Sequence, residues 1–136
     1  MDIGYAIIPF VAWLVTGLIK FLINSFQSKK LAFDLIGYGG LPSNHSAIVS
    51  SIVSLIGFRE GLDHPAFGLA ITLAFVVIMD AGSLRNQVGK HAKEINKISN
   101  EDKKHLPLRE RIGHSRVEIL AGIAVGVMVG WWINLL

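Results

Sequence analysis

The chain has 136 residues, a length that predicts a single domain over residues 1–136. Apolar residues make up 51% of it and charged residues only 17%, whereas a soluble domain carries about 25% charged residues. This composition excludes a disordered chain and argues against an ordinary soluble enzyme. Cysteine is absent, which excludes disulfides, thiolate metal sites and a cysteine nucleophile. The net charge of +3 lies in blocks between apolar runs, so we expect a membrane protein and no nucleic-acid partner.

Four stretches without Asp, Glu, Lys or Arg predict an all-α fold with four membrane-spanning helices in an up-down bundle. The stretches are residues 3–19, 35–58, 64–79 and 119–136. A bilayer core about 30 Å thick needs a helix of about 20 residues, with about 17 as the lower limit. The second stretch begins with glycine-rich loop sequence, so its helix is expected from Pro42 or Ser43 to Gly57. The third helix is expected to begin at Pro65 and to continue past Asp80.

The connecting segments carry unequal numbers of basic residues, and this asymmetry predicts the orientation. Of the 13 Lys and Arg residues, all but Arg59 fall on the side of the loops 26–41 and 82–116. The positive-inside rule places those loops in the cytoplasm and both termini outside, as in a multi-pass protein of the cell (inner) membrane. Met1 and Asp2 provide no basic segment for a signal peptide, so none is expected.

Polar residues suited to chemistry gather at the expected cytoplasmic ends of the helices. They are Lys20 and Lys29 around the end of the first helix, Ser43, Asn44 and His45 at the start of the second, Asp80 and Arg85 near the end of the third, and His114 and Glu118 at the start of the fourth. An up-down bundle brings these ends together although they are far apart in sequence. This convergence is the main indication of a functional site.

Each group also has a structural interpretation. The helix start after Ser43 offers unpaired backbone amides that suit a phosphate, and a plain interfacial helix cap explains the same residues. His114 and Glu118 are four residues apart, so we expect them on one helix face. The carboxylate would then hold one imidazole nitrogen and leave the other free to attack or to accept a proton, unless the two form only an interfacial pair. Asp80 and Arg85 indicate either a functional site or a structural ion pair.

Two further features have simpler interpretations. Lys90 and Lys93 belong to a charged segment that is expected to be a solvated helical extension, and they are not assigned to the site. Gly122, Gly126 and Gly130 form a stripe of small residues on the last helix. Such a stripe is typical of close helix packing, either within the chain or in a homodimer.

Three ordered motifs resemble those of a known superfamily. They read Gly39-Gly40-Leu41-Pro42-Ser43-Asn44-His45-Ser46-Ala47, then Asp80-Ala81-Gly82-Ser83-Leu84-Arg85, then Ile112-Gly113-His114 with Glu118-Ile119 downstream. The chain resembles the small divergent branch of the type-2 phosphatidic acid phosphatases, which share their site with the vanadium haloperoxidases, from Lys20 to Gly122. Asn44 stands where the parent superfamily has Gly, Glu118 stands where it has Asp, and its Arg-Pro pair is missing.

The resemblance implies a membrane enzyme that hydrolyses lipid phosphate monoesters, and the charge asymmetry places its site at the cytoplasmic surface. By this resemblance His114 attacks phosphorus and forms a phosphohistidine, Glu118 orients its ring, and His45 protonates the leaving alkoxide and then activates water. The phosphate oxygens would be held by Lys20, Lys29, Ser43, Asn44 and Arg85, with Arg109 as the second choice for Arg85. Asp80 would position Lys20 or Arg85, and the scheme requires no metal and no cofactor.

The expected substrate is phosphatidylglycerophosphate, because the inner leaflet contains it and its terminal monoester lies on an extended glycerol arm. Phosphatidic acid is the second choice. One alternative is a magnesium-dependent phosphatase that uses Asp80 and Glu118 as metal ligands, although nearby cations compete for the same negative charge. The other alternative is a lipid-binding or assembly protein that keeps the fold and has lost the chemistry, which the missing superfamily residues support.

Overall fold

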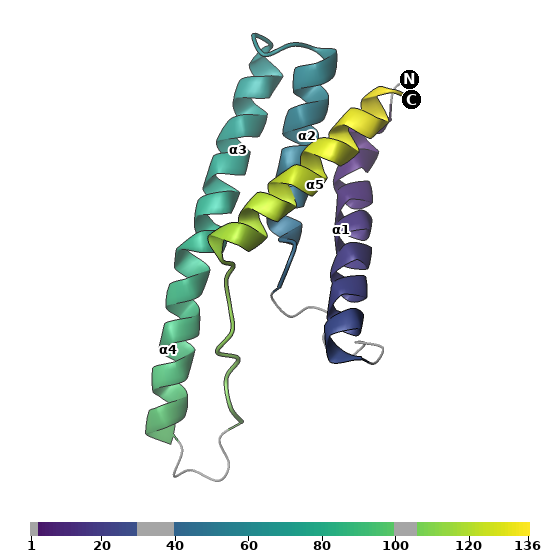
Figure 1. The fold of residues 1–136 in the computed structure, drawn as a ribbon. Coiled ribbons are helices and arrows are strands. Elements are labelled where there is room, and N and C mark those ends of the chain that lie inside the picture. Colours follow the sequence, from purple (N-terminus) through teal and green to yellow (C-terminus); the bar gives the residue numbers. More distant parts are fainter. Residues whose placement is uncertain (1–2, 30–39, 100–105) are drawn as a thin grey trace.

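The computed structural model describes residues 3–29, 40–99 and 106–136, and this part of the chain forms five helices and no strand (Figure 1). The helices are α1 (Gly4–Ser28), α2 (Asn44–Arg59), α3 (Pro65–Gly82), α4 (Leu84–Ile98) and α5 (Arg116–Asn134). The predicted all-α class is therefore confirmed. The helices α1, α2, α3 and α5 alternate in direction, and α1 begins at the same end of the bundle at which α5 ends (Figure 1).

The helices begin where the capping residues indicate. Ser43 caps α2, and its hydroxyl oxygen accepts a hydrogen bond from the backbone amide of Ser46. Pro65 opens α3 as predicted, after His64, whose Nδ1 accepts from the amide of Ala66. Of the glycine-rich segment expected before α2, the part up to residue 39 lies outside the described residues.

Three parts of the described chain are long and apolar enough to cross a membrane: α1, the combined α3 and α4 (Pro65–Ile98), and α5. Their 25, 34 and 19 residues bear apolar side chains that are largely exposed. The second helix, α2, has only 16 residues, about 24 Å in length, and is not among these spans. The chain is therefore a polytopic helical membrane protein, and three of the four predicted spans have full length.

The short helix α2 occupies the centre of the bundle. It packs against α1, α3 and α5, most extensively against α5. The buried cluster at the end opposite the predicted site joins α1, α2 and α5 through Ile8, Ala12, Leu55 and Val129. Because α2 lies between the other helices, it places its polar first turn inside the bundle rather than at a lipid-facing surface.

The glycine stripe of α5 allows this close packing. Gly122, Gly126 and Gly130 are all buried. A Cβ atom on Gly122 or Gly126 would overlap the backbone carbonyl oxygen of Ser43 or Ala47 in α2. Packing within the chain, one of the two expected uses of the stripe, is thus present. A homodimer stays a prediction, and it would need a different face.

The charged helix α4 continues from α3 beyond the end of the bundle, and the coil 106–115 returns beside it (Figure 1). Asn96 fixes this coil to α4, since its Oδ1 accepts from the Leu108 amide at 2.7 Å and its Nδ2 donates to the Leu108 carbonyl oxygen at 2.8 Å. The predicted helical extension is therefore present, but the returning coil covers one of its faces.

Candidate functional site

Two backbone hydrogen bonds join the helix ends that carry the predicted site residues. The amide of Ser43, at the start of α2, donates to the carbonyl oxygen of Glu118 in α5 at 2.9 Å. The amide of His114 donates to the carbonyl oxygen of Ala81, near the end of α3, at 3.0 Å. The convergence expected from an up-down bundle is therefore present, and main-chain contacts hold it in register.

His114 and Glu118 are in contact, but for a different reason from the one expected. His114 precedes α5, whose N-cap is Ser115, so the two side chains do not share a helix face. Instead, Glu118 completes a capping box: its amide donates to Ser115 Oγ at 3.3 Å, and its Oε2 accepts from the Ser115 amide at 2.8 Å. The same Oε2 lies 3.3 Å from His114 Nδ1. The predicted contact thus arises from a carboxylate that reaches back over the start of the helix.

The surroundings of His114 favour its neutral form. The side chain is 8% exposed, and burial lowers the pKa of His114 below its ordinary value of about 6.5. The Glu118 carboxylate opposes this effect, while the positive charges of Lys20 and Arg85 add to it. With the Nδ1 proton directed at Glu118, Nε2 keeps its lone pair. The ring is therefore suited to act as a nucleophile near neutral pH.

His45 lies beside this ring. It is the second residue of α2, and its ring centroid is 6.0 Å from that of His114, with the two planes tilted by 57°. His45 Nδ1 and the neighbouring Asn44 Oδ1 are buried and have no hydrogen-bond partner among the described residues. Unpaired buried polar atoms are rare in folded proteins, and a bound ligand, an ordered water or a catalytic role accounts for such atoms. The first turn of α2 therefore offers polar groups to a ligand next to both histidines.

The predicted cations divide into two groups. Lys20, half-buried on α1, and Arg85, on α4, both act electrostatically on His45 and His114. Arg85 Nε also donates to Asp80 Oδ2 at 2.6 Å. Of the two partners expected for Asp80, Lys20 and Arg85, the structure therefore shows Arg85. Lys29 is exposed at the left-handed C-cap of α1, and no described contact joins it to the other site residues.

The carboxylates of the site are already engaged. Glu118 contacts His114 and the Ser115 amide, and Asp80 contacts Arg85. In the part of the chain that the structure describes, no three His, Asp or Glu side chains lie close enough to hold a metal ion. Asp80 and Glu118 are thus directed at separate partners, which is a poor arrangement for a shared magnesium ion.

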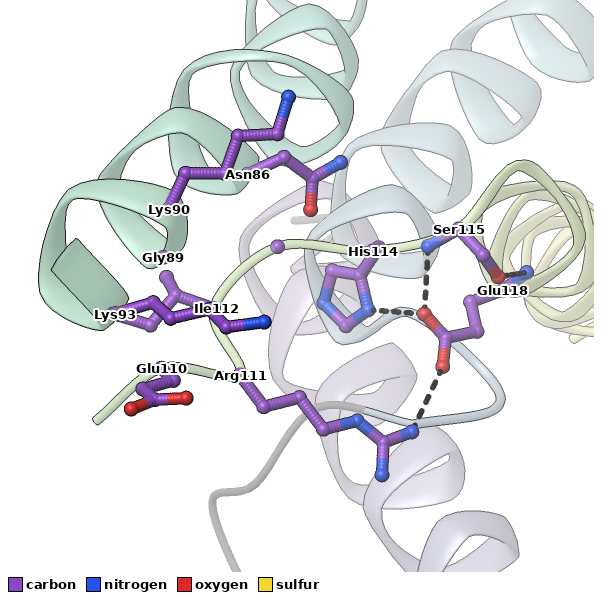
Figure 2. Close-up of a pocket in the computed structure, with 11 residues that line it drawn as sticks. Asn86, Gly89, Lys90, Lys93, Glu110, Arg111, Ile112, His114, Ser115 and Glu118 are labelled. Atoms are coloured by element: carbon purple, nitrogen blue, oxygen red, sulfur yellow. Dashed lines mark hydrogen bonds and ion pairs between the residues drawn. The ribbon is translucent and has the colours of Figure 1, made fainter. Parts of the chain in front are cut away.

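An open pocket of about 670 Å³ adjoins His114 between α4 and the coil 110–115 (Figure 2). His114 and Glu118 line it, whereas His45, Lys20 and Arg85 do not. The remaining charged residues of the lining are Lys90, Lys93, Glu110 and Arg111. Arg111 was not identified from the sequence, and the two lysines were assigned to a solvated helix. The His114 ring therefore separates the predicted site from a second basic region.

Two glycines carry the sequence signal for this pocket. A Cβ atom on Gly89 would lie 2.5 Å from the Glu110 carbonyl oxygen, so only glycine lets the coil lie against α4. Gly113 has φ +96°, and a side chain there would overlap Asn86. A glycine within a polar, charged helix is unfavourable unless another part of the chain approaches it closely. Gly89 could therefore have indicated the folded-back coil.

These observations define a polytopic helical membrane protein with a paired-histidine site at one end of its bundle. The chain belongs to the divergent PAP2 family, whose model matches residues 4–129. It is similar to the uncharacterized membrane protein YuiD of Bacillus subtilis (strain 168), with 29% identity over 128 residues, covering 82% of this chain and 81% of the relative. No solved structure matches the chain. The resemblance found in the motifs is thus confirmed, and the family supports a phosphatase-like role without naming a substrate.

Proposed function

We propose that the protein is a membrane phosphatase that hydrolyses lipid phosphate monoesters through a phosphohistidine on His114. The observation that carries this proposal is the arrangement of three side chains. His114 Nδ1 lies 3.3 Å from a Glu118 oxygen, and the His45 ring lies 6.0 Å from the His114 ring. An oriented nucleophile beside a second proton-transferring group is the arrangement that two-step hydrolysis needs.

In the first step, His114 Nε2 attacks phosphorus and the bond from phosphorus to the lipid oxygen breaks. His45 gives its proton to the departing alkoxide, and Glu118 stabilises the positive charge that forms on the His114 ring. In the second step, His45 takes a proton from water as the water oxygen attacks phosphorus, and the P–N bond breaks to release inorganic phosphate. A positioned acid or base of this kind contributes about 10²–10⁴-fold to the rate.

The phosphate oxygens are held in this proposal by Lys20, Arg85 and the first-turn amides of α2 at Asn44. Phosphoryl transfer needs mainly positioning and charge stabilisation, and cations with backbone amides supply both. Ser43 contributes as the cap of α2, because its hydroxyl oxygen already accepts hydrogen bonds from the Ser46 amide and hydroxyl. Asp80 positions Arg85. Lys29, which is exposed, attracts the anion from the membrane surface.

The site faces the cytoplasm in this proposal, since all basic residues except Arg59 fall on its side. A site at headgroup depth there reaches lipids of the inner leaflet, so phosphatidylglycerophosphate is the proposed substrate and phosphatidic acid the second choice. Basic residues beside an anionic membrane surface are attracted to it by about 1 kcal/mol each, so they favour an anionic headgroup.

Phosphate release by the purified protein tests the proposal. The assay uses mixed micelles that contain phosphatidylglycerophosphate, phosphatidic acid or a polyprenyl phosphate. His114→Ala should abolish release, while His91→Ala, which removes an exposed histidine of α4 outside the pocket, should retain it. Loss of activity in EDTA would favour the magnesium-dependent alternative. Binding of these lipids without phosphate release from any of them would contradict the proposal and favour a non-catalytic protein.

A further inference from the structure

The pocket beside His114 carries three cations that the proposed reaction does not use. Lys90 and Lys93 project from α4, and Arg111 comes from the facing coil with its guanidinium group toward Glu118 (Figure 2). Arg111 lies 3.9 Å from Glu118 and is 77% exposed, so this contact leaves most of the guanidinium available. Neither lysine is ion-paired with any carboxylate of the described residues. The pocket lining therefore contains three cations, from both walls, and two carboxylates, of which Glu110 accepts from Asn96 and Glu118 contacts Arg111 and His114.

The backbone of the pocket walls is held in place, and the exposed side chains of the three cations extend from it. The coil contacts α4 at Gly89, where a side chain would prevent the approach, and at Asn96, which binds Leu108 through both its donor and its acceptor. His114 is held from the other side by the backbone of Ala81. A ligand would thus meet cations whose backbone positions are already set, which lowers the entropic cost of binding.

The size and position of the pocket indicate what it binds. Its volume of about 670 Å³ lies within the range of about 300–1,000 Å³ that is usual for small-molecule sites. It opens along α4, the charged last part of the Pro65–Ile98 helix, and not along the apolar α3 part, so it suits a headgroup and not an acyl chain. Because His114 forms one of its walls, a group bound in it lies beside the proposed nucleophile.

We propose that this pocket binds a second phosphate group of the substrate through Lys90, Lys93 and Arg111. The inference rests on the proposed function and specifies its substrate class. The enzyme selects molecules in which a terminal phosphate monoester is joined by a short polar arm to another phosphate group. Such a molecule contacts cations on both sides of the His114 ring, whereas a molecule with one phosphate leaves the pocket cations unused.

The test compares two lipids, one with a phosphodiester and a terminal monoester and one with a single monoester, in neutral detergent micelles. The double variant Lys90→Gln/Lys93→Gln should lower the ratio of their kcat/KM values by about three- to tenfold, mainly through KM. Lys97→Gln is the matched control on α4, because its Nζ pairs with Glu94 at 2.7 Å and it lies outside the pocket. An equal ratio in the wild-type protein and the double variant would overturn the inference and leave the phosphatase proposal standing.

A binding measurement separates this inference from the phosphatase proposal. Pyrophosphate should bind the full-length protein in detergent more tightly than inorganic phosphate, and the Lys90→Gln/Lys93→Gln variant should lose that preference. If this result appears while no lipid is hydrolysed, the phosphatase proposal fails and the two-phosphate pocket stands. If the preference is absent, the pocket assignment fails. Comparing the affinity for a soluble glycerol bisphosphate with the affinity for the two-phosphate lipid shows whether the ligand is a free metabolite or a lipid headgroup. Either ligand carries the two phosphate groups that the inference requires.

Discussion

Replacing Gly122 with alanine tests whether the glycine stripe holds the two helix starts of the site together. A methyl group there would overlap the carbonyl oxygen of Ser43 and lie 2.9 Å from the Ser46 Cβ. The carbonyl oxygen cannot move away easily, since the Ser43 amide is bound to the Glu118 carbonyl oxygen at 2.9 Å. Overpacking of this kind costs about 1–3 kcal/mol. We therefore expect Gly122→Ala to lower the free energy of unfolding by about that amount.

Gly17→Ala provides the matched control, because a methyl group on Gly17 in α1 would meet nothing within 4 Å. The same substitution there should be neutral or stabilise the helix by about 0.5–1 kcal/mol. At Gly130 the nearest obstacle is the Ser54 hydroxyl, which can rotate, and the backbone oxygen of Ser51 would lie 2.9 Å from the added carbon. The Ser43 oxygen would lie closer than this to the carbon added at Gly122, so Gly130→Ala should cost less than Gly122→Ala. Unfolding in detergent, followed by tryptophan fluorescence, gives the order. Equal stability of the Gly122 and Gly17 variants would refute the packing argument.

The remaining predictions concern chemistry and orientation. The acid limb of the kcat/KM profile should lie below about pH 6.5, because burial lowers the pKa of His114 and its neutral form attacks; an acid limb centred above that value would contradict this. His45→Ala should slow hydrolysis of alkyl phosphates more than that of p-nitrophenyl phosphate, whose leaving group needs no proton, and equal slowing would argue against the proton-donor role. Cysteines at Ser28 and Ser99 should be shielded from membrane-impermeant reagents in intact cells, and one at Leu136 should react; the reverse pattern would invert the orientation.

The starts of two helices and one of the site contacts could be predicted from sequence because their causes are local. Ser43 and Pro65 are capping signals that act within one turn of helix, and the structure places α2 and α3 accordingly. Asp80 and Arg85 are five residues apart around the junction of α3 and α4, and they form a 2.6 Å ion pair. Local spacing was sufficient for these predictions.

The basic pocket could not be predicted in the same way, because it depends on a contact between distant segments. The coil after α4 lies against it at Gly89, Asn96 and Asn86, and hydropathy does not reveal which face of a charged helix is covered. The assignment of α2 as a membrane span was wrong for a related reason: its length is close to the predicted one, but its 16 residues are too few for it to be among the candidate spans. A charge-free stretch indicates burial, but it does not distinguish burial in lipid from burial among other helices.

Glu118 stands where the parent superfamily has aspartate, and the position of His114 explains the difference. His114 lies before the N-cap of α5 and not within the helix. A carboxylate in the third position of a helix can reach back to the N-cap amide, and glutamate is the acidic residue that completes a capping box there. In this chain Glu118 binds the Ser115 amide at 2.8 Å, and the same oxygen also lies 3.3 Å from His114. One side chain therefore stabilises the start of α5 and orients the proposed nucleophile, so this departure from the motif is compatible with a working site.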